Sequence, residues 1–220
     1  MYVIMLGAPG TGKGTVGNLL SRELNVPHIS SGEIFRSYVK KHGEIGKKID
    51  SFISYGRLVP DDLAIELIEK RLQETDVENG AILDGFPRTL PQAKVLDTML
   101  KNNNKKIEVA VNLSLPDEEI ISRIVTRRTC PNPMCREIYN LDYNPPKVEG
   151  ICNKCGTKLI QRSDDNEETV KERLKIYHQI SENIIDYYKN KDLLYTVKLN
   201  NSSNTTTKDV AKEIKEYLLK

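Results

Sequence analysis

Residues 7–15, GAPGTGKGT, surround a single lysine with four glycines. Glycines let backbone N–H groups converge on phosphate oxygens, and the dipole of a helix that follows adds positive potential. Lys13 is placed to reach the outer phosphates of a nucleotide. The strict phosphate-loop pattern has Ser or Thr directly after the lysine, whereas Gly14 precedes Thr15 here. An apolar run at 2–6 precedes the loop and a helical pattern follows it, so the arrangement predicts a nucleotide site.

A second constellation holds the four cysteines of the chain, in CPNPMC and CNKC. Cys130 and Cys135 form a C-x4-C pair, Cys152 and Cys155 form a C-x2-C pair, and sixteen residues separate the two pairs. Thiolate pairs at such separations suit tetrahedral zinc, and a closed shell of four cysteines leaves no position for a catalytic water. In a reducing compartment, clustered cysteines are metal ligands more often than disulfides. We therefore expect structural Zn²⁺, with free cysteines, disulfides or iron as the alternatives.

Both constellations need a framework, and the apolar pattern of the chain predicts one. Short apolar runs indicate five buried strands, at 2–6, 28–30, 81–83, 109–113 and 194–199. Helical patterns separate them, at 12–24, 61–75, 91–100, 117–128, 167–189 and 207–219. Alternating strands and helices predict an α/β fold with a parallel five-stranded sheet that helices cover on both faces.

Two segments break this alternation. Residues 31–59 are polar and helical, and residues 129–161 contain the cysteines and several prolines in a β-rich pattern. Both are expected to be insertions at the carboxyl ends of sheet strands, where α/β proteins bind ligands. The asparagine-rich stretches 102–106 and 200–207 are expected to be surface loops.

The totals limit the classes of function. The 220 residues carry 33 basic and 31 acidic side chains, a formal net charge of +2, which does not favour a nucleic-acid or membrane binder. No apolar run approaches the roughly 18 residues needed to span a bilayer. The glycine loop begins at residue 7, which leaves no room for a secretion signal. We expect a cytoplasmic monomer, or a mature form whose presequence is missing.

Six motifs resemble those of one known family. In chain order they are GAPGTGKGT (7–15), SSGEIFR (30–36), GRLVPD (56–61), LDGFPRTLPQA (83–93), SRIVTRR (122–128) and RSDDNEETVKERL (162–174). Together they closely resemble the adenylate kinases, over residues 1 to about 190. The resemblance implies a phosphate-loop nucleotide-binding fold with two mobile insertions and the reaction ATP + AMP ⇌ 2 ADP. It also implies a Mg²⁺ requirement, ATP, AMP and ADP as partners, and a role in adenine-nucleotide homeostasis.

The resemblance also divides the chain into parts. A core formed by residues 1–29, 60–125 and 164–220 would carry an insertion over the monophosphate at 30–59 and a lid at 126–163. Family members with a long lid hold zinc there, and their first cysteine pair is usually C-x2-C, so two residues are inserted here. A lid of about 35 residues is too small for a core of its own, which is a physical reason to expect a metal staple.

Phosphoryl transfer needs positioning and charge compensation more than covalent chemistry, so a cationic clamp is expected. By resemblance, the catalytic side chains are Lys13, Arg88, Arg127, Arg162 and Arg173. The implied ATP site comprises Gly10, Thr11, Gly12, Lys13, Gly14, Thr15, Arg123, Arg127, Ile138 and Tyr139. Arg123 and Arg127 are four residues apart on the predicted helix 117–128, so they are expected to share one face. By resemblance, Arg123 lies against the adenine of ATP and Arg127 reaches its phosphates.

The implied AMP site comprises Ser31, Arg36, Arg57, Leu58, Val59, Gly85, Phe86, Pro87, Arg88, Gln92, Arg162 and Arg173. Arg36 and Arg88 resemble the pair that grips the AMP phosphate, for which planar guanidinium groups are well suited. The Gln92 amide is expected to read the adenine edge through paired hydrogen bonds. The chain departs from the family at Val16, where Gln is common, and in the loop 200–204, which lacks the glycine expected near the ATP base.

Carboxylates complete the predicted site. Asp84 ends an apolar strand and is expected to hold Mg²⁺ through water, since magnesium gives up its waters reluctantly. Asp164 and Asp165 resemble family residues that pair with the clamp arginines when the lid closes. The three histidines match no motif and are expected to be structural or solvated: His28, His42 and His178.

Two other functions remain open at this stage. One is a kinase for another monophosphate, such as UMP or GMP, and the residues that would decide it are Ser31, Val59 and Gln92. The other is a binding protein in which a zinc ribbon is joined to a nucleotide switch. That reading predicts a basic face or interleaved aromatic residues, and the near neutrality and the absence of Trp argue against it.

Overall fold

A computed structural model gives the fold and describes residues 1–41, 43–199 and 206–219. The loop 200–204 and His42, about which the sequence made predictions, lie outside these residues. Five parallel strands form the central sheet in the order β2-β3-β1-β4-β7. They are β1 (Tyr2–Gly7), β2 (His28–Ser30), β3 (Ala81–Asp84), β4 (Ile107–Ser114) and β7 (Leu194–Lys198). The predicted five-stranded parallel α/β fold is therefore confirmed.

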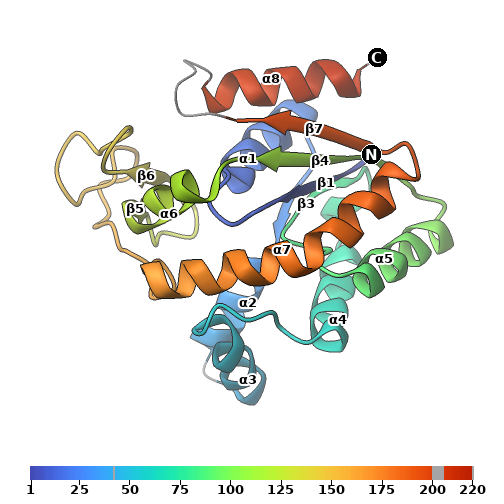
Figure 1. Ribbon diagram of the computed structural model, residues 1–220, viewed down its shortest axis with the longest axis horizontal. Coiled ribbons are helices and arrows are strands. Elements are labelled where there is room, and N and C mark those ends of the chain that lie inside the picture. The colour runs from blue at the N-terminus through green and yellow to red at the C-terminus, as the bar shows by residue number, and fades with distance from the viewer. Residues whose placement is uncertain (42, 200–205, 220) are drawn as a thin grey trace.

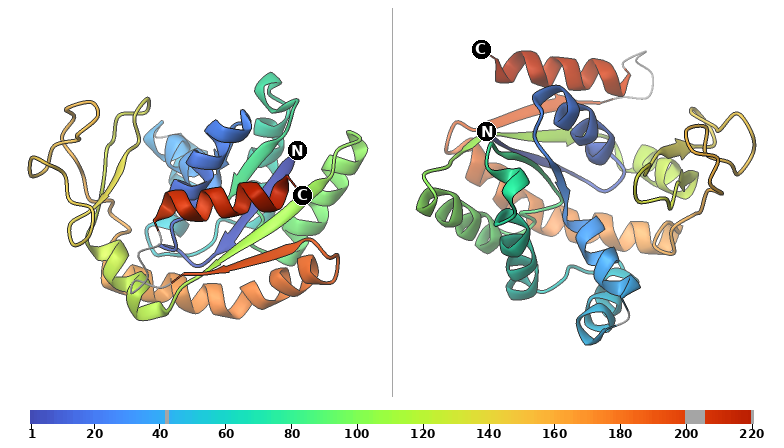
Figure 2. Two further views of the ribbon diagram at one scale, coloured as in Figure 1. Left: turned by 90° about the horizontal axis from the view of Figure 1, so that it is seen from above. Right: turned by 180° about the vertical axis from the view of Figure 1, so that it is seen from behind.

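Helices cover the sheet on both faces, because each strand sends apolar side chains alternately to one face and the other. The covering helices are α1 (Lys13–Leu24), α4 (Asp61–Leu72), α5 (Leu90–Asn102), α7 (Glu167–Lys189) and α8 (Thr207–Leu218). In β1, Val3 and Met5 pack with residues of α1 and α8. Ile4 and Leu6 pack on the other face with residues of α4, α5 and α7. Figures 1 and 2 show α7 and α8 on opposite sides of the sheet.

Two segments leave the sheet at the carboxyl ends of strands. After β2, α2 (Ser31–Lys40) and α3 (Glu44–Ile53) enclose a small apolar cluster with the start of α4. The short η1 (Thr75–Val77) follows α4. After β4, α6 (Asp117–Val125) leads into the antiparallel strands β5 (Arg127–Thr129) and β6 (Ile138–Asn140). Figure 1 shows β5 and β6 beyond the arrow tips of β4 and β7, with α2 and α3 below the sheet.

The helix predicted over 117–128 is too long, because α6 gives way to β5 before Arg127. Arg127 pairs with Asn140 across the β5–β6 hairpin. The side-chain amide of Asn140 also donates to the hydroxyl of Thr126, the residue that ends the helix. The prediction that Arg123 and Arg127 share one helical face is therefore wrong. Arg123 lies on α6 and Arg127 belongs to the hairpin.

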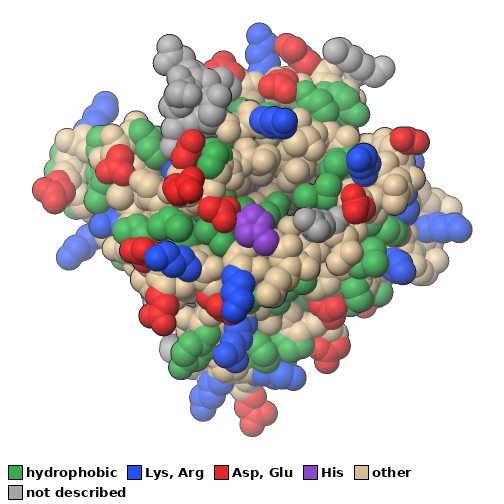
Figure 3. All heavy atoms as spheres, in the orientation of Figure 1, with side chains coloured by type: hydrophobic (Ala, Val, Ile, Leu, Met, Phe, Trp, Pro, Cys, Tyr) green, Lys and Arg blue, Asp and Glu red, His purple; other side chains and the backbone are tan. Residues whose placement is uncertain are grey.

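The outer surface is mixed in charge. Figure 3 shows basic and acidic side chains interspersed over the face on which α7 lies, in line with the small net charge of +2. On its inner side, α7 buries four apolar side chains at helical spacing: Val170, Leu174, Ile184 and Tyr188. Across the described part of the chain, we find no helix with the length and apolar character needed to cross a membrane.

Candidate functional site

The phosphate loop runs from the end of β1 into the first turn of α1. Gly10 and Gly12 have positive φ values of 85° and 94°, a backbone conformation that favours glycine. A Cβ atom at position 10 would lie 2.8 Å from Cγ1 of Ile124, so α6 packs directly against the loop. Helix α1 begins immediately after Gly12 and has no acidic residue in its first turn. The positive end of this helix and the loop backbone therefore meet at one place, which suits an anion.

Lys13 lies folded over this loop, where its ammonium group donates to two loop carbonyl oxygens at 2.7 Å each. Burial lowers the pKa of Lys13 to about 8. Asp84 opposes this change, whereas the cations of Arg88, Arg173 and Arg127 lower the pKa further. An anion bound beside the lysine would raise its pKa again.

Asp84 ends β3 and faces the loop, since a Cβ atom at Gly14 would lie 3.4 Å from its Oδ2 atom. The same oxygen lies 3.6 Å from Nε2 of His28, and both side chains are largely buried. Burial raises the pKa of Asp84, but His28 and the charges of Lys13 and Arg88 outweigh that effect and hold the pKa below its usual value. The carboxylate is therefore kept ionised beside the phosphate loop, as a magnesium ligand must be. No pattern in the sequence indicates that His28 is the neighbour of Asp84.

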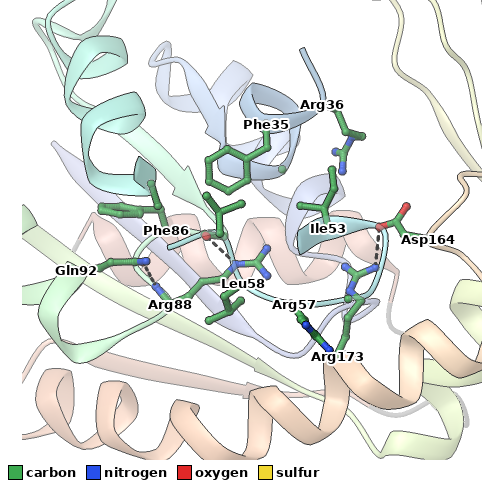
Figure 4. A pocket seen from close by; sticks show the side chains of 15 residues that line it. Phe35, Arg36, Ile53, Arg57, Leu58, Phe86, Arg88, Gln92, Asp164 and Arg173 are labelled. Carbon is green, nitrogen blue, oxygen red and sulfur yellow. Dashed lines mark hydrogen bonds and ion pairs between the residues drawn. The ribbon is translucent and has the colours of Figure 1, made fainter. Parts of the chain in front are cut away.

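A pocket lies between the α2–α3 insertion and the residues that follow β3 (Figure 4). Phe86 and Gln92 lie at one end of it, and Arg36, Arg173 and Asp164 lie at the other. An apolar ring beside an amide suits a nucleotide base, and guanidinium groups suit a phosphate. The pocket brings together most of the residues predicted for AMP: Arg36, Arg57, Leu58, Val59, Gly85, Phe86, Arg88, Gln92 and Arg173.

The remaining predicted AMP residues lie around this lining. Ser31 is 1% exposed, and its hydroxyl donates to the carbonyl oxygen of Gly85 at 2.7 Å. Arg88 donates to the same oxygen through Nε at 2.8 Å, so this carbonyl fixes both side chains. Pro87 follows Phe86 through a cis peptide bond. Burial lowers the pKa of Arg88.

Arg162 lies near other charged residues of the predicted clamp. Burial lowers its pKa to about 9, and the charges of Arg36 and Arg127 act in the same direction. Burial also lowers the pKa of Arg173 to about 10, against the opposing effect of Asp164. Several cations therefore share a partly desolvated space, which gives the site a strong positive potential for a polyanion.

Two arginine–aspartate pairs hold the segment that precedes α7, and one of them reaches it from β5. Arg127 of β5 grips Asp165 through two guanidinium nitrogens, with Nε 2.9 Å from Oδ2, and Asp165 is only 1% exposed. Arg173 of α7 binds Asp164, with Nη1 3.0 Å from Oδ2. Both predicted lid-closure carboxylates thus lie against clamp arginines.

Three residues of the predicted ATP site, Arg123, Ile138 and Tyr139, lie on α6 and β6, and only Arg123 is predicted to lie against the adenine. Cζ of Arg123 is 5.6 Å from the ring centre of Tyr143, a cation–π contact inside the lid region. Ile138 is half-buried at the start of β6. Tyr139 is 4% exposed and packs among the lid cysteines, so its ring belongs to the lid interior. A contact from Tyr139 to ATP would have to come from its backbone.

The lid also touches the insertion over the pocket. Arg136, which directly follows Cys135, forms an ion pair with Glu33 of α2, a residue 103 positions earlier in the chain. Arg136 is exposed, and Glu33 lies one helical turn before Arg36. The two insertions are therefore in contact with each other as well as with the core.

The four cysteines converge, with all their sulfur atoms within 4.8 Å of one another. All four are free thiols, with Sγ–Sγ distances of 3.4 Å from Cys130 to Cys155 and 3.6 Å from Cys135 to Cys152. Four sulfurs placed about 2.3 Å from one zinc ion would lie about 3.8 Å apart, so the cluster fits a tetrahedral ion. The longer C-x4-C loop delivers both of its sulfurs to the cluster.

Known proteins of one family are similar to this chain. The family model described as adenylate kinase matches residues 5–193 of the chain. The chain is similar to the adenylate kinase of Archaeoglobus fulgidus, with 50% identity over 197 residues that cover 90% of each protein. It is also similar to the adenylate kinase of Caldicellulosiruptor saccharolyticus, with 46% identity over 214 residues that cover 97% of this chain and 99% of that relative. The matched regions include the phosphate loop, the pocket and the cysteine-bearing lid.

Proposed function

The chain belongs to the adenylate kinase family, and we propose that it transfers a phosphoryl group from magnesium-bound ATP to AMP in adenine-nucleotide homeostasis. Family membership gives the reaction itself, ATP + AMP to two ADP. The observation that carries the proposed sites is that one short segment touches both of them, because Asp84 faces the phosphate loop and the next residue, Gly85, lines the pocket with Arg88. The phosphate loop and the pocket therefore share one charged space, as direct transfer between two nucleotides requires.

In this proposal the phosphate loop holds the ATP phosphates. Its backbone N–H groups and the start of α1 face the anion, and Lys13 exchanges its bonds to loop carbonyls for bonds to phosphate oxygens. Arg123, Ile138 and the backbone of Tyr139 flank the base of ATP. The loop residues are Gly10, Thr11, Gly12, Lys13, Gly14 and Thr15.

In this proposal AMP binds in the pocket. Its base lies at the end formed by Phe86 and Gln92, and its phosphate lies toward Arg36 and Arg88. Guanidinium groups can each make two parallel bonds to phosphate oxygens, which sets the direction from which AMP attacks. The other proposed contacts come from Ser31, Arg57, Leu58, Val59, Gly85 and Pro87.

The remaining cations stabilise the phosphoryl group during transfer. Arg127, Arg162 and Arg173 converge from the lid and α7, and the carboxylates of Asp164 and Asp165 hold two of them in place. Fixed cations aimed at the equatorial oxygens lower the barrier because they need no rearrangement at the moment of reaction. The closed lid also keeps water from taking the phosphoryl group.

Two metals fit the residues present. Asp84 is ionised beside the loop and would hold Mg²⁺ through water, and the ion would compensate charge on the ATP phosphates. Cys130, Cys135, Cys152 and Cys155 would hold Zn²⁺, which would staple the lid together. A monomeric state stays a prediction that sedimentation would test.

A coupled assay of ADP formation tests the proposed substrate pair. With ATP and Mg²⁺, AMP should be turned over much faster than GMP, UMP or CMP, and ATP alone should be hydrolysed only slowly. A better rate with UMP or GMP would overturn the assignment of AMP. The alternative of a zinc ribbon joined to a nucleotide switch gains no support, since the family match includes the loop and the lid together.

A further inference from the structure

Asp61 lies behind the proposed base end of the pocket without lining it. It is the first residue of α4 and closes the motif GRLVPD. Its Oδ1 atom accepts from Nε2 of Gln92 at 2.7 Å, and its Oδ2 atom accepts from the hydroxyl of Thr89 at 2.8 Å. Both carboxylate oxygens are therefore occupied by residues at the start of α5.

The other end of the Gln92 amide is also fixed. Its Oε1 atom accepts from the backbone N–H of Arg88 at 2.8 Å, and the residue is 2% exposed. A carboxylate only accepts hydrogen bonds and a backbone N–H only donates them. If the amide were flipped, its oxygen would face Asp61 and its NH₂ group would face the N–H of Arg88, so both contacts would become repulsive.

Thr89 also has a fixed donor and acceptor role in this hydrogen-bond network. Its hydroxyl oxygen accepts from the backbone N–H of Gln92 at 3.3 Å, as the N-cap of α5. The hydroxyl proton is therefore directed to Asp61. Each member of the network has one consistent donor or acceptor role, and the orientation of the Gln92 amide follows from the charge of Asp61.

We infer that Asp61 is a positioning residue that sets the base specificity of the monophosphate site through Gln92. This inference rests on the proposed binding of AMP in the pocket. An amide has two N–H bonds and two oxygen lone pairs. The bonds to Asp61 and Arg88 use one of each, so one N–H donor and one lone pair remain for a ligand in the pocket that Gln92 lines.

The remaining donor and acceptor distinguish two classes of purine. Adenine offers an acceptor at N1 and a donor at its 6-amino group, which match an amide held in one orientation. Hypoxanthine and guanine offer a donor at N1 and an acceptor at O6, and they match only the flipped amide. Because Asp61 holds the amide in place, the N1–H donor of a 6-oxopurine would face the amide N–H and its O6 acceptor would face the amide oxygen. Such unpaired polar groups are costly in a buried site.

The test compares AMP with IMP, whose base differs from adenine only at this edge. We expect Asp61→Asn to lower the preference for AMP over IMP, measured as the ratio of kcat/KM values, by about tenfold. Asparagine can both donate and accept, so the backbone N–H of Arg88 alone then opposes the flip of the Gln92 amide. The loss should appear as a raised KM for AMP, with the KM for ATP unchanged.

Asp62→Asn is the matched control, because Asp62 is the exposed next residue of the same helical turn and the charge change is the same. It should keep the wild-type ratio. Gln92→Ala should lose most of the preference, and Asp61→Asn added to it should cause little further loss, since Asp61 acts through Gln92. A role in folding alone would lower turnover of both acceptors equally and leave the ratio intact, which would overturn the inference.

Thr89→Val keeps the test decisive if Asp61→Asn does not fold. This variant removes one of the two donors to Asp61, so it weakens the constraint on the Gln92 amide without abolishing it. The ratio of kcat/KM for AMP to that for IMP should therefore fall about twofold to threefold. An unchanged ratio would contradict the inference. Failure of the wild-type protein to form ADP from AMP would instead refute the proposed function, so the two failures are distinguishable.

Discussion

The core and the lid are stabilised in different ways. The core sheet packs a large apolar cluster on each face, one with α4, α5 and α7 and the other with α1 and α8. The cluster inside the lid contains Cys130, Tyr139, Cys152 and Leu159, with Cys135 packed against it. Three of these five residues are proposed zinc ligands. The core is therefore held by apolar burial, and we expect the lid to depend on its thiols.

The charges proposed to act in phosphoryl transfer do not include the lid thiols. Lys13 and Arg88 belong to the core, and no cysteine is among the residues that line the described pocket. Loss of a core cation should therefore reduce turnover and change stability little. Loss of a lid thiol should reduce stability and change turnover little.

The largest effect is expected for Lys13→Met. Turnover should fall by roughly 10²-fold or more, because the variant removes charge stabilisation from the transferred phosphates. The melting temperature should stay close to wild type or rise slightly, since a charged group no longer has to be buried. Steady-state kinetics and thermal denaturation measure both. The exposed Lys48→Met is the control, and a Lys13→Met protein that loses its fold would break the contrast.

The next effect concerns the lid thiol in Cys152→Ser. The variant should lose its zinc, as metal analysis would show, and the melting temperature should fall by at least about 5 °C, because metal binding contributes to folding. The exposed Met134→Ala in the same lid should keep both the zinc and the melting temperature. If the wild-type protein contained no metal and melted at the same temperature as Cys152→Ser, the proposed zinc site would be wrong.

A smaller effect is expected in the protonation of Lys13, in the core. Because the pKa of Lys13 is about 8 without nucleotide, binding of the ATP anion at pH 8 should take up roughly half a proton as that pKa rises. The uptake should vanish below about pH 7, where the lysine is already protonated. Calorimetry in two buffers of different ionisation enthalpy measures it. Equal uptake by Lys13→Met would show that another group titrates.

The same pKa shift has a consequence for stability. The lowered pKa means that the unfolded chain binds more protons than the native protein between pH 8 and pH 10.5. The wild-type free energy of unfolding should therefore rise with pH across this window relative to that of Lys13→Met. Urea titrations at several pH values would show it. A difference that stays constant would mean that Lys13 is not desolvated.

The smallest effect is expected at the contact between the two insertions. Arg136→Ala removes the exposed ion pair with Glu33, and such pairs contribute about 0–1 kcal/mol. The KM for AMP should rise no more than a few-fold, and high salt should remove the difference from wild type. Lys147→Ala in the same lid is the control. A loss of turnover as large as that of Lys13→Met would make Arg136 itself part of the reacting centre and contradict this prediction.

The strands and the glycine loop could be predicted because their signals are local. An apolar run such as residues 2–6 and a glycine pattern around Lys13 predict buried backbone and phosphate binding without knowledge of distant residues. The end of α6 could not be predicted, because it depends on Asn140 of the hairpin, which binds Thr126 and pairs with Arg127. The helix propensity of the segment gives no sign of that partner.

The residues of the site also divide into those that local motifs predict and those that depend on contacts between distant residues. Arginines at motif positions could be assigned to the clamp, and the structure brings most of them to one charged space. The contact of Asp61 with Gln92 could not be predicted from the motif GRLVPD, because it joins residues 31 positions apart through the packing of α4 on α5. His28 was missed as a neighbour of Asp84 because the pairing of β2 with β3 brings them together.

The most direct test of the contrast between core and lid is the rate of ADP formation by Cys152→Ser, measured in the cold, where the variant is still folded. Each molecule keeps the phosphate loop, the pocket and the clamp, so we predict a rate within about threefold of wild type, less than one kcal/mol in the barrier. Circular dichroism on the same sample confirms the fold. A folded Cys152→Ser protein whose turnover has fallen as far as that of Lys13→Met would contradict the account.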